Sequence, residues 1–91
     1  MLRLKPKLRT KIQVIGSAVE DYYYVYMPVD GSIKVVNSTA LEILKYCDGN
    51  HTVLEIVRKL AQEYSIDESK VLDDVIAFIK RAHEEGVLEF T

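Results

Sequence analysis

Thiol and imidazole side chains most often carry nucleophilic or metal chemistry, and the sequence has three of them: Cys47, His51 and His83. A reactive cysteine needs a lowered thiol pKa, and no neighbouring residue of Cys47 supplies one, so we interpret it as a small buried side chain. A metal site needs three or four clustered donors, and Cys47 with His51 gives two at best. The four glycines are scattered and form no phosphate-binding loop. We therefore expect no catalytic residue, metal or cofactor, and predict that the protein is not an enzyme.

Tyrosines suggest a second kind of chemistry, because four of the six lie within residues 22–26. Aromatic rings on a sheet can stack on the bases of single-stranded nucleic acid. Nucleic-acid binders are usually basic, however. Here the formal net charge is −2, and Lys34 is the only basic residue on the neighbouring predicted strand. We therefore interpret alternate tyrosines as core and as cover for the outer sheet, and we expect no nucleic-acid partner.

The chain has 91 residues, which is enough for a single domain spanning residues 1–91. Its charge is uneven, since residues 1–11 hold five basic and no acidic residues, whereas residues 65–91 hold seven acidic and three basic ones. Residues 1–10 could form an extended basic arm, because Pro6 divides the strand-like pattern there. No segment is long and apolar enough for a membrane span or a signal peptide. With its single cysteine, the chain is expected in a reducing compartment, the cytoplasm.

Three strands are predicted from alternating and β-branched residues. The alternation between residues 2 and 15 gives a strand near residues 11–15, and residues 22–27 give the strongest strand signal. A short third strand at residues 33–36 follows the turn Pro28-Val29-Asp30-Gly31. If Asp30-Gly31 formed a two-residue type I′ turn, Tyr26 would lie opposite Val35. Both faces of this hairpin are largely apolar, so the sequence leaves open which face meets the helices.

Three helices follow the strands, and their ends carry capping signals. Asn37 or Ser38 can cap the first, which runs to about residue 46 and ends at Asp48-Gly49. Thr52 and Glu55 form a capping box for the second, which runs to about residue 64. Asp67 is the expected cap of the third and longest helix, which ends at Gly86. The order β-β-β-α-α-α predicts an α+β domain, a winged helix-turn-helix with a three-stranded antiparallel sheet.

Winged helix-turn-helix domains often bind DNA, and residues 67–85 would then be the recognition helix. Its first turns carry four carboxylates and one opposing cation, Lys70; the carboxylates belong to Asp67, Glu68, Asp73 and Asp74. Because affinity for DNA comes chiefly from neutralising phosphate charge, these carboxylates oppose binding. A DNA-binding regulator that instead uses the basic arm, Arg3 to Lys11, is kept as the alternative.

An extended peptide is the ligand that the predicted elements fit best. A strand edge at residues 33–36 would carry unpaired amides and carbonyls, which accept an incoming strand by β-augmentation. The third helix has more apolar surface than one core contact requires, although Val71, Val75 and Phe78 are equally explained as plain core. If this helix lies beside the edge strand, the two form a groove for a peptide.

Two longer stretches, VVNSTALEILKYCDGNHTVLEIVRKLAQEY and DESKVLDDVIAFIKRAHEEGVLE, resemble the PqqD-like family. These are small leader-peptide-binding domains of ribosomally made, modified peptides, also called RiPP recognition elements. The resemblance covers residues 5–90 and consists of many weak markers in a shared order. They are Asn37, Ala40, Ile43-Leu44, Asp48-Gly49, Thr52-Val53, Glu55-Ile56, Asp74-Val75, Phe78-Ile79 and Gly86-Val87-Leu88.

This resemblance implies a non-catalytic peptide chaperone that holds a precursor's leader as an extra strand against the third helix. It implies delivery to a modifying enzyme, of the radical S-adenosylmethionine (SPASM) type as in PQQ biosynthesis, or to a leader peptidase. The implied peptide-binding residues are Ile33, Lys34, Val35, Val36, Val71, Asp74, Val75 and Phe78. Asp74 would hold a basic leader residue. The tyrosine cluster and the basic arm depart from the usual family pattern, and open strand edges would also permit a homodimer.

Overall fold

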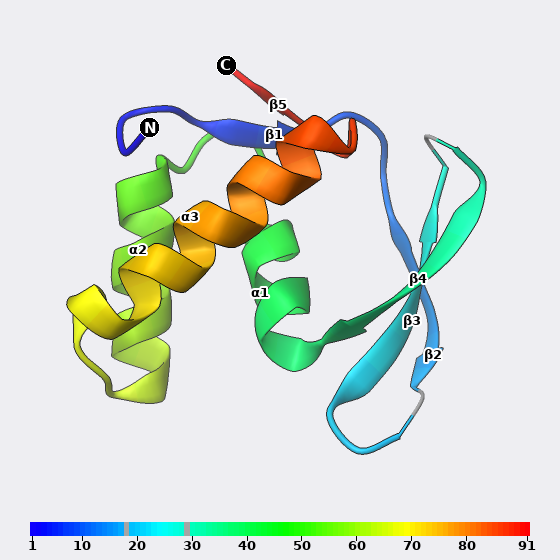
Figure 1. Ribbon diagram of the computed structural model, residues 1–91, viewed down its shortest axis with the longest axis horizontal. Helices are drawn as coiled ribbons and strands as arrows, with labels where there is room; N and C mark the ends of the chain where they lie inside the picture. Colours follow the sequence, from blue (N-terminus) through cyan, green and yellow to red (C-terminus); the bar gives the residue numbers. More distant parts are fainter. Residues whose placement is uncertain (18, 29) are drawn as a thin grey trace.

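The computed structural model describes residues 1–17, 19–28 and 30–91. Its elements, in chain order, are β1 (Pro6–Leu8), β2 (Gln13–Ser17), β3 (Tyr22–Met27), β4 (Ser32–Asn37), α1 (Ser38–Tyr46), α2 (Val53–Tyr64), α3 (Glu68–Glu84) and β5 (Leu88–Phe90). The three helices lie together on one side of the molecule, and the sheet of β2, β3 and β4 lies on the other (Figure 1). The predicted α+β class, with a three-stranded antiparallel sheet followed by three helices, is confirmed.

The sheet has the order β2-β3-β4, so β3 pairs with both neighbours and β4 is an edge strand. Tyr26 pairs with Ile33 and Tyr24 with Val35, so the predicted register, with Tyr26 opposite Val35, is wrong. The connection is longer than two residues, because Met27 pairs with Ser32 and Asp30 folds back to accept the Ser32 N–H at 2.9 Å. Val29, a part of the predicted turn, lies outside the described residues.

The register error is two residues, so every side chain keeps its predicted face. The inner face carries Val25 and Met27, which are buried, with Tyr23 and Val36 packed against the core. The outer face leaves large apolar side chains 42–60% exposed, namely Tyr22, Tyr24, Ile33 and Val35. The structure thereby answers the question left open by the sequence: the odd-numbered residues of β3 meet the helices.

The helix caps follow the sequence signals at two of the three helices. Asn37 caps α1 by accepting the Ala40 N–H at 2.8 Å. Thr52 and Glu55 form the complete capping box of α2, with distances of 2.8 and 3.1 Å. Asp67 occupies the cap position of α3, but its side chain accepts no hydrogen bond there. The expected cap is therefore right in position, while the expected side-chain bond is missing.

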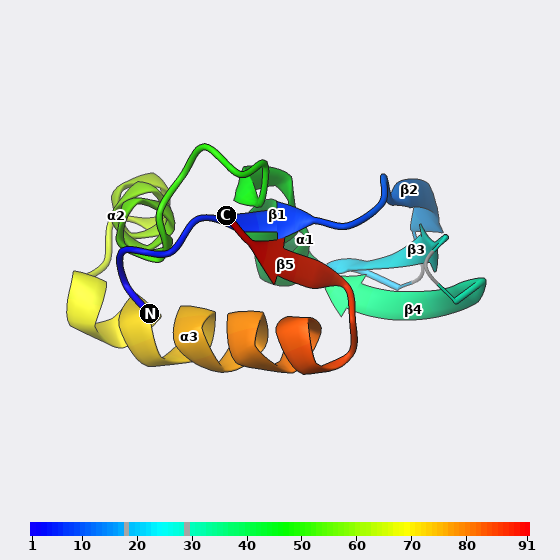
Figure 2. The same ribbon diagram turned by 90° about the horizontal axis from the view of Figure 1, so that it is seen from above.

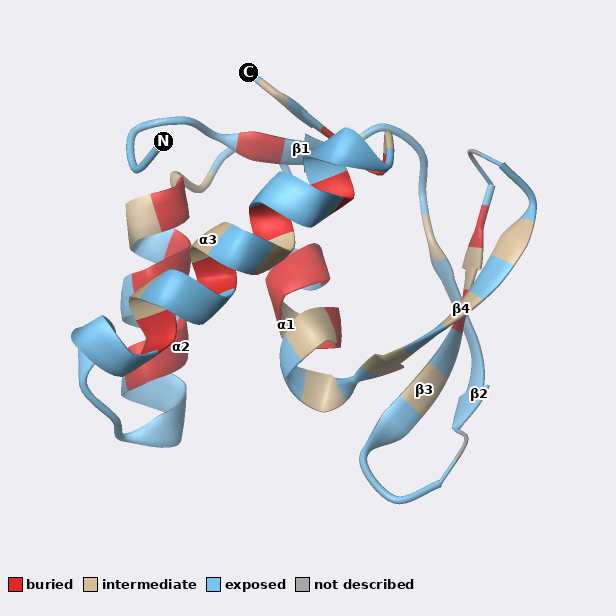
Figure 3. Cartoon of the chain, viewed as in Figure 1, coloured by how far each residue is buried: buried red, intermediate tan, exposed pale blue. Residues whose placement is uncertain are grey.

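The core lies between the helices and the inner face of the sheet (Figure 3). Its fully buried side chains come from every helix and include Leu44 of α1, Ile56 and Leu60 of α2, and Val75 and Ile79 of α3. These positions recur at helical spacing, which is the pattern of amphipathic helices packed on a common core.

The basic N-terminal segment is docked on the domain along its length. Strand β1 pairs antiparallel with β5 on one side, and on the other the Leu8 N–H donates to the Cys47 carbonyl at 3.0 Å. The carbonyls of Leu2 and Leu4 accept the N–H groups of Leu54 and Val53, at the start of α2. The segment therefore satisfies amides that a helix N-terminus leaves free.

Candidate functional site

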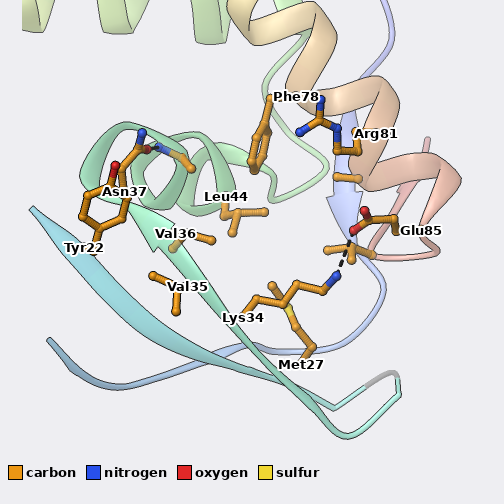
Figure 4. A pocket seen from close by; sticks show the side chains of 13 residues that line it. Tyr22, Met27, Lys34, Val35, Val36, Asn37, Leu44, Phe78, Arg81 and Glu85 are labelled. Carbon is orange, nitrogen blue, oxygen red and sulfur yellow. Dashed lines mark hydrogen bonds and ion pairs between the residues drawn. The ribbon is translucent and has the colours of Figure 1, made fainter. Parts of the chain in front are cut away.

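A groove of about 340 Å³ lies between β4, α1 and the C-terminal half of α3 (Figure 4). Its lining includes the apolar side chains of Val36, Leu44 and Phe78. Charged side chains of Lys34, Arg81 and Glu85 also line it. A lining that combines apolar surface with a few polar groups is typical of ligand sites in proteins.

One wall of the groove is the open edge of β4, and the hydrogen-bond pattern of the sheet shows which groups are free. The Ser38 N–H donates to the Asp21 carbonyl at 2.9 Å, in the same register as the β3–β4 pairs. Hydrogen-bonded pairs alternate along an antiparallel ladder, so Lys34 and Val36 bond toward β3. The backbone N–H and C=O groups of Ile33 and Val35 consequently point away from β3. No described strand pairs with them.

The other wall is one face of α3. Phe78, Arg81, Ala82 and Glu85 are spaced three or four residues apart, which places them on a common side of a helix. Phe78 is half-buried and Ala82 is buried, while Arg81 and Glu85 are exposed. Wall and strand are joined at one point, where the Lys34 ammonium lies 3.0 Å from the Glu85 carboxylate (Figure 4). This pair is exposed, so it contributes little to stability.

The structure brings together five of the eight residues singled out from the sequence. Ile33, Lys34, Val35 and Val36 form the edge strand, and Phe78 faces the groove beside them. Lys34 and Val36 point to the helix side of the sheet, whereas Ile33 and Val35 place their side chains on the outer face and offer backbone groups to the edge.

The other three residues lie elsewhere. Val71, Asp74 and Val75 line a separate cavity of about 340 Å³ between α1, α2 and α3. Val71 and Val75 are 7% and 1% exposed and belong to the core. The reason is helical geometry, since these residues come one or more turns before Phe78, where α3 packs on α2 rather than beside β4. Asp74 is exposed and lines this cavity together with Lys70.

Sequence reasoning missed the part of the groove that follows Phe78. Arg81, Ala82 and Glu85 continue its helical face, and Val87 and Leu44 complete the apolar lining. The three helical residues could have been found by extending the i+3, i+4 and i+7 series from Phe78. Leu44 and Val87 come from other elements, and no periodicity connects them with α3.

The thiol of Cys47 and the metal-ligating side chains were the candidates for chemistry in the sequence. Cys47 is 2% exposed, and its burial, together with nearby Asp48, raises the pKa of the thiol to about 12. The Cys47 thiol donates to the Ile43 carbonyl at 3.1 Å, as expected for a buried structural residue. Among residues 1–17, 19–28 and 30–91 there is no cluster of three or more metal-ligating side chains. No helix of the described chain is both long and apolar enough to span a membrane.

Two solved structures share this arrangement of strands and helices. One is TbiB1 in complex with the TbiA(β) leader peptide, with 19% identity and a TM-score of 0.69 over 91% of this chain and 94% of that one. The other is the PqqD truncation of Methylobacterium extorquens PqqCD, a RiPP recognition element, with 24% identity and a TM-score of 0.72. That match covers 92% of this chain and 87% of the other. The fold is therefore that of the RiPP recognition elements.

Sequence comparison then identifies the family. Residues 22–88 match the family described as coenzyme PQQ synthesis protein D (PqqD). A PqqA binding protein of Methylococcus capsulatus is 34% identical over 86 residues, which cover 94% of this chain and 84% of the relative. The chain belongs to the PqqD family.

Shorter matches to Rhodopseudomonas palustris relatives give the same name. The PqqA binding protein of strain BisB5 is 37% identical over 49 residues, which span 54% of this chain and 48% of that relative. The matched part is thus about half of the relative's length. These relatives agree with the prediction that the protein is not an enzyme. They give no support to the DNA-binding alternative.

Proposed function

We propose that the protein is a non-catalytic adaptor that binds the leader of a PqqA-type precursor peptide. The leader adds to the open edge of β4 as a further strand and lies against the C-terminal half of α3. The observation that carries this proposal is the pair of free backbone positions, Ile33 and Val35, which border an apolar groove. Backbone hydrogen bonds from these positions supply affinity and register, and alternate guest side chains enter the groove.

The charged side chains of the groove favour a guest peptide with complementary charges. Arg81 and Lys34 offer positive charge and Glu85 negative charge within one site. A guest carboxylate beside Arg81 would be stabilised by charge-assisted hydrogen bonds. Asp74, expected to hold a basic leader residue, lies in the neighbouring cavity, where a leader longer than the groove would reach it.

The proposal is tested by titrating isotope-labelled protein with a synthetic PqqA peptide of Methylococcus capsulatus. We expect saturable amide shifts concentrated at residues 32–37 and 78–87. Because a flexible guest must be ordered, affinities from about micromolar to tens of nanomolar are expected. Absence of saturable shifts, or shifts spread evenly over the chain, would refute the proposal.

We further propose that the adaptor works in the cytoplasm, where ribosomal precursors are made, and passes the bound leader to a modifying enzyme. A radical S-adenosylmethionine enzyme of the SPASM type, or a leader peptidase, fits this role. The benefit is a high effective concentration of substrate at the enzyme. It is measured as a fall in the enzyme's KM for the precursor when adaptor is added, and an unchanged KM contradicts the proposal.

A homodimer is compatible with the same surfaces. The open edge of β4 and the apolar outer face around Tyr24 and Ile33 are both able to pair with a second copy. If the dimer uses the β4 edge, leader binding will dissociate it. Light scattering with and without peptide measures this directly, and a dimer that is unaffected by the leader would rule out pairing through that edge.

A further inference from the structure

A second groove, of about 520 Å³, is formed by the segment from Lys7 to Ile12 and the end of α1. No residue of α3 is among those that line it; in Figure 2 the segment that leads from β1 to β2 runs at the level of α1 and rises away from α3. The peptide groove described above lies on the α3 side. The two grooves therefore have different linings, apart from Leu44.

The second groove has a basic rim and an apolar floor. Lys7, Arg9, Lys11 and Lys45 contribute four cations, and Asp48 contributes the one carboxylate. That carboxylate is already engaged, because Asp48 accepts the Asn50 N–H at 2.8 Å and lies 3.0 Å from His51 Nδ1.

Most of the rim charge is not compensated within the chain. Of the four cations, Lys45 alone forms an ion pair with another described residue, at 3.5 Å from Glu42. The floor is provided by four apolar side chains, Leu8, Ile12, Leu44 and Cys47, all half-buried or buried. A positively charged rim over an apolar floor selects a ligand with the opposite charge and one apolar side chain.

The backbone that carries these charges is held on both sides. The Gly49 N–H donates to the Pro6 carbonyl at 3.0 Å, and the Arg9 N–H donates to the Val87 carbonyl at 3.0 Å. The alkyl chain of Lys7 packs so closely over Gly49 that a Cβ there would lie 3.2 Å from it. The part of the groove formed by Lys7, Leu8 and Arg9 is thus held in place before a ligand binds, which lowers the entropic cost of binding.

We propose that this basic groove, residues 7–12 with residues 44–48, docks an acidic segment of a protein partner. One apolar side chain of the segment rests on Leu8, Ile12 and Leu44, and flanking carboxylates face Lys7, Lys11 and Lys45. The inference rests on the proposed function in one respect: we take the partner to be the enzyme that receives the bound leader. A complex of adaptor, leader and enzyme requires two separate surfaces, and the two grooves provide them.

A protein segment fits the groove better than nucleic acid does. Nucleic-acid binding needs a row of phosphates to be neutralised, but the C-terminal part of the chain, residues 65–91, has a net charge of −4. The apolar floor has no use in phosphate binding. Leu44 borders both grooves, and its side chain is 1% exposed. The two sites therefore share one buried residue and are otherwise lined by different residues.

The test uses the whole protein, isotope-labelled, and acetyl-Glu-Asp-Leu-Asp-Glu-amide as the probe. We expect saturable amide shifts at residues 7–12 and 44–48. Lys11→Glu should weaken binding at least fivefold, whereas Lys80→Glu, a matched charge reversal on the exposed side of α3, should leave it unchanged. Raising NaCl from about 50 to about 300 mM should weaken it severalfold, since exposed charges are screened. A probe with alanine in place of leucine should bind at least threefold more weakly.

Several outcomes would overturn the inference. They are no saturable shift in these residues, equal loss with Lys80→Glu, equal binding of the alanine probe, and tighter binding of a 12-base-pair DNA duplex. Self-association that Lys11→Glu abolishes would also overturn it, because the occupant would then be a second copy. A Val35→Pro protein separates this inference from the proposed function, since it should bind the PqqA peptide at least fivefold more weakly and bind the acidic probe as before.

Discussion

Replacing Val35 by proline removes a single hydrogen-bond donor from the open edge of β4. The alternation fixed by the bond from Ser38 to Asp21 places the Val35 N–H on the side away from β3. Proline is tolerated in edge strands where the missing N–H would have faced outward. The Val35 side chain is 55% exposed on the outer face of the sheet, so its loss removes little packing.

The expected cost to peptide affinity follows from one unsatisfied guest carbonyl. Leaving a buried acceptor without its donor costs about 1–3 kcal/mol, which corresponds to about a fivefold to 150-fold rise in Kd. The expected cost to folding is smaller, below about 1 kcal/mol, because no β3–β4 hydrogen bond is lost. Val36→Pro is the converse case. It removes a bond within the sheet and half-buried packing, so we expect a loss of about 2–4 kcal/mol of folding free energy.

The assay is fluorescence anisotropy with a labelled PqqA peptide, together with thermal unfolding of each variant. Val35→Thr is the matched control, since threonine keeps the N–H and the β-branched shape; it should bind like the original protein. Each 1 kcal/mol lost from the free energy of unfolding lowers the thermal unfolding midpoint by about 4–8 °C in a domain of this size. The midpoint of Val36→Pro should therefore lie well below that of Val35→Pro. Unchanged affinity in Val35→Pro would refute strand addition at this edge. Equal destabilisation by both prolines would refute the assigned alternation.

Three further predictions concern the groove wall, the thiol and a helix cap. Phe78→Ala should weaken peptide binding, and because Phe78 is half-buried it should destabilise the fold less than its fully buried neighbour does: Ile79→Ala should cost about 2–5 kcal/mol by thermal unfolding. Reversed effects would contradict the assigned faces. The raised thiol pKa of Cys47 predicts that iodoacetamide reacts slowly at pH 8 until urea unfolds the protein; rapid native labelling would contradict its burial. Two interactions lower the pKa of Glu55: the larger is the hydrogen bond from the Thr52 backbone N–H, and the smaller is the hydrogen bond with the Thr52 side chain. The folded state therefore favours the carboxylate form of Glu55. The stability advantage over Glu55→Gln should therefore be full above pH 4.5 and fade as the pH falls below it, and a pH-independent difference would contradict the capping role.

Local sequence signals predicted the elements and their faces well. The caps at Asn37 and Thr52 arise from contacts within four residues along the chain, and they are visible in the sequence for that reason. The predicted assignment of the hairpin's side chains to two faces is also correct, although the register was wrong. The register error is two residues, and side chains in a strand return to the same face every second residue. The predicted two-residue turn was wrong because the Asp30 side chain accepts hydrogen bonds from Ser32 and supports a longer loop.

The groove was predicted in part, and the missing part depends on long-range packing. A free edge at residues 33–36 follows from the order of strands, and Phe78 follows from the apolar face of α3. Which turn of α3 lies beside β4 is decided by the packing of α2 against α3, and sequence periodicity carries no such information. Val71 and Val75 were placed in the groove for that reason, whereas the structure gives this position to Arg81 and Glu85.

The packing of the basic N-terminal segment on the domain likewise could not be predicted from local sequence patterns. Pro6 and the alternating basic residues predicted an extended arm over residues 1–10, and in the structure Pro6–Leu8 of this segment form strand β1. Its partners are β5, Cys47 and the start of α2. Leu8 bonds to Cys47 across 39 residues of sequence, and Lys5 bonds to Thr91 across 86. Pairing over such distances leaves no pattern within either segment.

Hydrogen exchange of the β4 amides is the most direct measurement of the central claim. Without peptide, the amides of Lys34 and Val36 should exchange slowly and those of Ile33 and Val35 quickly, following the alternation of the ladder. A saturating PqqA peptide should slow Ile33 and Val35 by at least tenfold and change Lys34 and Val36 much less. If Ile33 and Val35 exchange equally fast with and without the bound peptide, the leader does not add to this edge.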